Sequence, residues 1–133
     1  MKETIRIGNC SGFYGDRLAA AKEMVEGGPI DVLTGDYLAE LTMKILYDQR
    51  EQRGAHMGYV GTFLKQLEDV VELCMAKGIK IVTNAGGLNS AGMAVEVERI
   101  LQEKGVTAKV AYIDGDDLMP ELSALQADGE AFV

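Results

Sequence analysis

The sequence predicts an α/β fold with an open, mostly parallel sheet of about four strands and helices on both faces, a Rossmann-like arrangement. Short β-branched runs alternate with long amphipathic stretches along the 133 residues. Strands that are separated by helices pair in parallel through right-handed crossovers. The strand runs are continuous and apolar, as expected when helices cover both faces of a sheet. The chain has 16 Gly but only 2 Pro, which indicates tight turns rather than disorder.

Hydrophobic periodicity places the elements along the chain. The predicted strands are residues 4–7, 30–34, 80–83 and 108–113. The predicted helices are residues 16–26, 37–52, 62–77 and 91–104, with a last one starting near residue 118. Asp16 is expected to be the N-cap of the first helix, and Gly78 the C-terminal stop of the third. Residues 53–59 contain two glycines and predict an exposed loop.

The length fits a single domain over residues 1–133. The net charge is -8 and the basic residues are scattered, which argues against nucleic-acid binding and against an anionic membrane surface. The N-terminus is too short and polar for a signal peptide, and no apolar run has membrane-spanning length. We therefore expect a cytoplasmic protein. The six acids from Asp114 onward, without any Lys or Arg, predict a solvated end.

The loops after the predicted strands form the expected working surface. In an open parallel sheet, ligands bind outside the carboxyl ends of the strands, where the N-termini of the following helices favour anions. These loops are small and polar: residues 8–16, 35–37, 84–90 and 114–117. Turn formation explains any one of them alone, but the four together favour a binding site.

The glycine spacing leaves the cofactor unknown. Glycines at 8, 12 and 15 give GxxxGxxG, which differs from the dinucleotide patterns GxGxxG and GxxxGxG. Residues 84–86 (NAG) are reminiscent of short-chain dehydrogenases, but no Tyr is followed four residues later by the Lys that their chemistry requires. The absence of GxxxxGK[ST] excludes a P-loop.

Carboxylates and thiols are the candidate reactive groups. Asp16, Asp36 and Asp114 each follow a predicted strand, and convergence would raise one pKa and make an acid/base or cation site. Helix capping is the alternative for Asp16 and Asp36. Cys10 and Ser11 are candidate nucleophiles if the only His, at position 56, folds over them; a surface His and a buried Cys are the alternative. No metal site is predicted, since CxxC and EF-hand spacings are missing.

Three segments resemble the acyclic terpene utilisation (AtuA-like) family. They are residues 8–46 (GNCSGFYGDRLAAAKEMVEGGPIDVLTGDYLAELTMKIL), residues 79–105 (IKIVTNAGGLNSAGMAVEVERILQEKG) and residues 110–118 (VAYIDGDDL). The resemblance covers nearly the whole chain and implies the N-terminal part of a longer family domain. It also implies a bacterial-type catabolic role in the breakdown of acyclic terpenoids such as citronellol and geraniol through acyl-CoA intermediates. The family's reaction is not securely defined, so no catalytic residue is carried over from it.

We therefore expect a catabolic protein that binds a small anionic substrate, such as a CoA ester, at the loops after the strands. A non-catalytic nucleotide- or metabolite-binding or assembly domain is the alternative, and whether the chain is an enzyme stays open. A homo-oligomer, or association with the missing part of the protein, is expected because four short strands make a small sheet. The candidate catalytic residues are Asp16, Asp36 and Asp114. The candidate substrate-binding residues are Asn9, Cys10, Ser11, Gly12, Gly15, Tyr37, Asn84, Gly86, Gly87 and Asn89.

Overall fold

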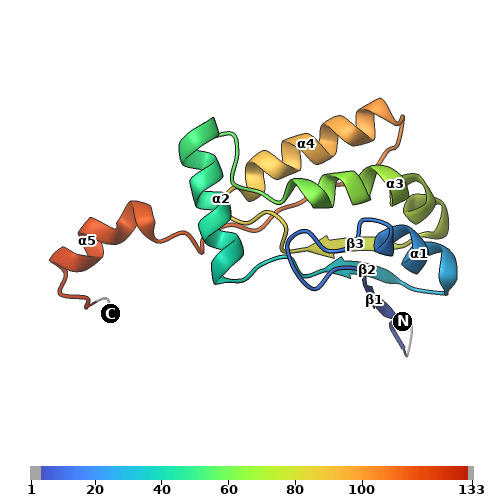
Figure 1. Ribbon diagram of the computed structural model, residues 1–133, viewed down its shortest axis with the longest axis horizontal. Helices are drawn as coiled ribbons and strands as arrows, with labels where there is room; N and C mark the ends of the chain where they lie inside the picture. Colours follow the sequence, from blue (N-terminus) through green and yellow to red (C-terminus); the bar gives the residue numbers. More distant parts are fainter. Residues whose placement is uncertain (1–3, 132–133) are drawn as a thin grey trace.

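The structure, a computed structural model, describes residues 4–131. Its elements follow one another as alternating strands and helices (Figure 1). In chain order they are β1 (Ile7–Asn9), α1 (Ala20–Gly27), β2 (Val32–Gly35), α2 (Glu40–Arg53), α3 (Gly61–Lys77), β3 (Lys80–Thr83), α4 (Ser90–Glu103), the short 3-10 helix η1 (Met119–Glu121) and α5 (Leu122–Ala127).

The three strands form one parallel sheet in the order β1-β2-β3. Ile7 lies opposite Val32, which lies opposite Lys80, and the ladder continues in register through the following residues. Each strand is joined to the next by at least one helix, as parallel pairing requires. The predicted open, parallel α/β arrangement is therefore confirmed, with three strands instead of four.

The helices cover one face of the sheet only. Leu33 and Ile81, paired on β2 and β3, pack with buried residues of α1 and α3 such as Val25 and Val70. The two helices lie against each other, and α4 packs on α3 (Figure 1). On the opposite face, Ile7 is 65% exposed. The prediction of helices on both faces is wrong, because strands added successively in one direction by right-handed crossovers place every connecting helix on the same side.

The predicted fourth strand, residues 108–113, is also wrong. This segment has no strand pairing within residues 4–131. Val106 and Val110 pack against the core, but Tyr112 and Ile113 are 52% and 93% exposed. The apolar pattern predicted a strand, but a strand also needs a hydrogen-bonded ladder, and two half-buried valines pack this part of the chain against the core without one.

The first helix begins later than predicted. α1 starts at Ala20, and its N-cap is Ala19, which makes no side-chain cap. Asp16 is therefore not the helix cap; its carboxylate instead accepts hydrogen bonds inside the loop that precedes α1. The predictions for α3, β3 and α4 agree with the structure to within one residue.

The loop between α2 and α3 is tied to the carboxyl end of the sheet. The N–H of Val60 donates to the carbonyl of Ala85 over 2.8 Å, and the N–H of Leu88 donates to the carbonyl of Gly58 over 2.8 Å. Leu46 of α2 is fully buried in the same core. These contacts hold α2 beside the loops that follow the strands (Figure 1). Among the described residues, no helix has both the length and the apolar character needed to cross a membrane.

Candidate functional site

The loops after all three strands meet at the carboxyl end of the sheet. The N–H of Asp36 donates to the carbonyl of Ser11 over 3.0 Å. The Asn84 side chain donates from Nδ2 to Asp36 Oδ1 over 2.6 Å and accepts from the N–H of Tyr37 over 2.9 Å. Ser11 follows β1, Asp36 follows β2 and Asn84 follows β3. The structure thus brings four of the predicted site residues into one hydrogen-bonded junction.

Asp36 is the carboxylate at the centre of this junction. Its side chain is exposed, and Oδ1 is held by Asn84, with a weaker contact of 3.4 Å from the N–H of Leu38. Oδ2 makes no hydrogen bond to the residues that the structure describes. One oxygen of Asp36 is therefore fixed in place while the other is open to a solute.

The Asp16 carboxylate accepts hydrogen bonds from backbone N–H groups of the glycine-containing loop that follows β1. It accepts from the N–H of Gly12 over 2.9 Å and from the N–H of Arg17 over 2.7 Å. These two hydrogen bonds lower the pKa of the Asp16 carboxyl. An anion bound by the same N–H groups would have to displace this carboxylate. This geometry counts against phosphate binding of the dinucleotide type at Gly12.

An open groove of about 590 Å³ runs from this loop along α1. Its lining includes Asn9, Ser11 and Asp16. Arg17 also lines it and was missed by the sequence analysis, because it belongs to none of the patterns considered there. The Arg17 guanidinium pairs with Glu23 through two hydrogen bonds of 2.5 and 2.7 Å. We call this hollow the β1 groove.

Asp114 lies elsewhere, in a second groove formed by residues 87–91 and 114–119 together with Met43 and Leu122. Asp16 and Asp114 therefore line separate grooves, and Asp36 lines neither. The expected convergence of the three acids is not seen. Across residues 4–131, no three His, Cys, Asp or Glu side chains are close enough together to hold a metal ion.

Two predicted site residues in the loop after β3, Gly86 and Asn89, have contacts that stabilise the fold. Asn89 donates to the carbonyls of Ala55 and Met57 over 3.2 and 3.1 Å. Its Oδ1 accepts from the N–H of Gly92, so the residue caps α4 and fastens the loop before α3. A Cβ on Gly86 would lie 2.9 Å from the Cα of Ser90. Packing and capping therefore account for both Gly86 and Asn89.

Asn9 and Gly15 have few contacts. Asn9 is exposed at the end of β1, and Gly15 is exposed in the following turn. The Asn9 side chain makes no hydrogen bond among the described residues, so its amide is available to a molecule in the β1 groove.

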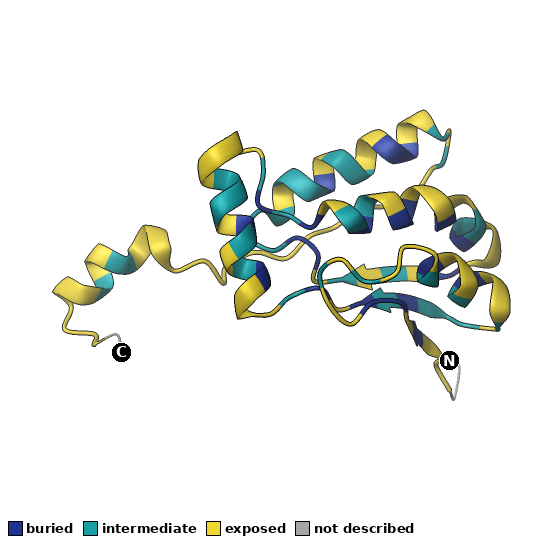
Figure 2. Ribbon diagram, in the orientation of Figure 1, coloured by how far each residue is buried: buried dark blue, intermediate teal, exposed yellow. Residues whose placement is uncertain are grey.

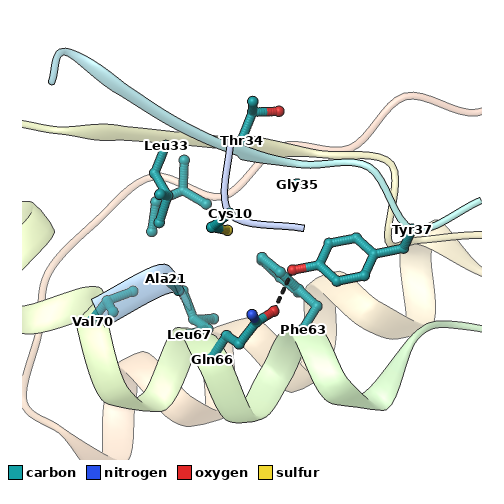
Figure 3. A pocket seen from close by; sticks show the side chains of 11 residues that line it. Cys10, Ala21, Leu33, Thr34, Gly35, Tyr37, Phe63, Gln66, Leu67 and Val70 are labelled. Atoms are coloured by element: carbon teal, nitrogen blue, oxygen red, sulfur yellow. Dashed lines mark hydrogen bonds between the residues drawn. The ribbon is translucent and has the colours of Figure 1, made fainter. Parts of the chain in front are cut away.

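A buried polar pair forms the floor beneath the junction (Figure 3). The Tyr37 hydroxyl donates to Gln66 Oε1, and both residues are at most 2% exposed. They line a cavity of about 10 Å³ with Cys10, about the room that one water needs. Burial and the neighbouring Cys10 raise the pKa of the Tyr37 hydroxyl well above its usual range. Gln66 was missed, although a polar residue beside Phe63 and Leu67 on an apolar helix stripe was a readable signal.

Cys10 and His56 lie in different environments. Cys10 is buried, and burial raises the pKa of its thiol, which disfavours the nucleophilic thiolate. His56 is exposed in the loop after α2, whereas Cys10 lines the small cavity with Tyr37 and Gln66. The alternative interpretation, a buried Cys and a surface His, fits the described residues better.

Both thiols are expected to be inert in the folded protein. Burial raises the pKa of Cys74 to about 11 from an ordinary value of 9.0, which lowers its thiolate fraction about 100-fold near neutral pH. A thiol reagent such as DTNB should react with neither cysteine at pH 8, and with both after unfolding in guanidinium chloride. Rapid labelling of Cys10 in the native protein would show that the β1 loop opens or that this thiol is activated.

One comparison with known proteins connects this geometry to a family. The family model described as acyclic terpene utilisation family protein AtuA matches residues 5–132. The chain belongs to this family. A search of the curated proteins and a search of the solved structures found no significant match. Membership in the AtuA family connects the chain with acyclic terpene utilisation, and the matched range contains the whole junction of Ser11, Asp36 and Asn84.

Proposed function

We propose that this AtuA-family protein binds a small anionic intermediate of acyclic terpenoid breakdown, such as a CoA thioester, at the loops that follow its strands. Asp36 acts there as the acid/base group and Asn84 positions it; Asp36 adjoins the β1 groove through its N–H, which donates to the carbonyl of the lining residue Ser11. The observation that carries the proposal is the junction in which Ser11, Asp36 and Asn84 meet at the carboxyl end of a parallel sheet. This edge is where open parallel sheets bind their ligands.

The state of Asp36 supports the acid/base assignment. Asn84 uses its amide to hold one carboxylate oxygen and its carbonyl to hold the Tyr37 backbone, so the carboxylate is oriented by a fixed neighbour. A general base needs this kind of fixed orientation and an open oxygen within hydrogen-bond reach of the substrate. Asp16 has no open carboxylate oxygen, because Oδ2 accepts a hydrogen bond from the N–H of Gly12 and Oδ1 accepts one from the N–H of Arg17.

Arg17 supplies the positive charge for an anionic substrate. It is the only Lys or Arg among the described residues that line the β1 groove. Its present partner is Glu23, and both side chains are more than half exposed. Exposed ion pairs contribute little to stability because water screens both charges, so a substrate carboxylate or phosphate can replace Glu23. The free Asn9 amide beside it can then donate to a carbonyl.

Asp36→Asn is expected to abolish turnover, or reduce it about 100-fold or more, while the melting temperature changes little. The amide keeps the size of the side chain and its contact with Asn84 but cannot take a proton. The measurement is thermal unfolding with and without geranyl-CoA, citronellyl-CoA and the free acids, followed by product analysis. Asp69→Asn is the matched control, because Asp69 is exposed on α3 and away from the junction.

Full turnover by Asp36→Asn would reject the role of Asp36. A wild-type protein whose melting temperature responds to no thioester and no acid would reject the substrate class. A response to nucleotides alone would favour the nucleotide-binding alternative over the present proposal.

A further inference from the structure

The sheet face opposite the helices is apolar and uncovered. Ile5 and Ile7 are 63% and 65% exposed, and Val82 is 59% exposed. Val32 lies between β1 and β3 in register with Ile7 and Lys80. Contiguous exposed apolar patches of this kind mark interaction surfaces in soluble proteins. The same face carries Thr34, in register with Val82, and Asn9, in register with Thr34. We call residues 5, 7, 9, 32, 34, 80 and 82 the open face.

The C-terminal segment carries apolar side chains in and just before α5. Leu122 and Leu125 are half-buried and lie three residues apart on one side of α5, and Leu118 is the N-cap of η1. Leu118 and the adjoining Met119 are 56% and 68% exposed, and most of α5 is exposed in Figure 2. We call residues 118–127 the arm.

The arm lies away from the body of its own chain. Among the described helices and strands, α5 lies against η1 alone. Its first residues border the second groove, and the rest projects beyond α2, away from the sheet (Figure 1). α5 has six residues, and a helix this short is not stable in water without a surface to pack on. The part of α5 beyond Leu122 and the open face therefore both lack an apolar partner among the described helices and strands.

We propose that two copies of this chain exchange arms, so that the arm leucines of one copy pack on the open face of the other. The charges are complementary: from Asp114 to the end the chain has six acids and no Lys or Arg, whereas the open face carries Lys80 and no acid. The direction of the arm favours a second copy, because it projects past α2 and away from the sheet, and reaching its own open face would require residues 111–117 to turn back (Figure 1). Reciprocal exchange about a twofold axis covers both open faces at once.

Disulfide trapping tests this pairing directly. Val82→Cys and Leu125→Cys are placed in separate chains, which are mixed and mildly oxidised. The native thiols are both buried and free, so they do not interfere. A covalent dimer should appear on a non-reducing gel for the mixture. Val95→Cys mixed with Leu125→Cys is the matched control and should give no such dimer, because Val95 is 63% exposed but lies on α4.

Solution mass supplies the second measurement. The wild-type chain is expected to be a dimer by light scattering, and Leu122→Glu/Leu125→Glu a folded monomer with at least about a 10-fold weaker self-association. A wild-type monomer would overturn the proposal. An internal disulfide in a single chain that carries both cysteines would also overturn it, because the arm would then lie on its own sheet. A disulfide-linked dimer of Val82→Cys alone would overturn it as well, because two open faces would then be stacked on each other.

Discussion

Gly87→Ala is expected to lower the free energy of unfolding by about 3 kcal/mol. Gly87 has a φ of 53°, and the left-handed region costs an L-residue about 1–2 kcal/mol. An added Cβ would also lie 2.4 Å from Leu46 Cδ1 and 2.8 Å from the carbonyl oxygen of Gly58. Leu46 is fully buried and cannot move aside, and overpacking of this kind costs about 1–3 kcal/mol. Urea unfolding followed by circular dichroism measures the sum.

Gly105→Ala separates the two causes. Gly105 also has a left-handed backbone, with a φ of 63°, but an added Cβ there would have no atom within 4 Å. This control should therefore cost only the backbone term of about 1 kcal/mol. Equal losses for the two variants would contradict the packing argument. The expected difference means that the structure alone requires glycine at position 87, whether or not a ligand contacts it.

The elements that the sequence predicted best have strong local signals. α3 combines a long apolar stripe with Gly78, which takes a left-handed conformation at the helix end, and β3 has three consecutive β-branched residues after Lys80. The start of α1 was mispredicted because the Asp16 carboxylate can bond either forward to a helix or back to Gly12. No neighbouring residue in the sequence indicates which of these two hydrogen bonds Asp16 will make.

Tertiary features were the least predictable. The uncovered sheet face follows from the strand order, which no single segment encodes. The strand-end loops of the site were predictable from the alternation of strands and helices, and so was the presence of Asp36 and Asn84 there. The floor was predictable only in part: Gln66 stands on the apolar stripe of α3, but its partner Tyr37 comes from a different segment of the chain, and no local pattern pairs the two.

Tyr37→Phe is expected to lower the free energy of unfolding by about 1–3 kcal/mol. The ring stays in place, packed edge-on against Phe63 with centroids 6.0 Å apart, but the Gln66 carbonyl loses its donor inside the core. A buried polar group that is left without a partner costs about that amount. Tyr47→Phe is the matched control, since Tyr47 is 46% exposed and its hydroxyl can reach water. That change should stay within about 0.5 kcal/mol.

The double variant Tyr37→Phe/Gln66→Leu then tests whether the two groups act as a pair. Each single change leaves one buried group unsatisfied, whereas the double change removes both, so the combined loss should be smaller than the sum by about 1 kcal/mol or more. Strict additivity would show that the Tyr37 hydroxyl is satisfied instead by its other neighbours, Cys10 and Ser11. Gln66 also donates from Nε2 to the carbonyl of Arg17 over 3.4 Å, so the same pair holds the floor under the β1 groove. A coupled pair would show that Tyr37 and Gln66 stabilise the core together, while the second hydrogen bond of Gln66 links this buried pair to the loop that lines the β1 groove.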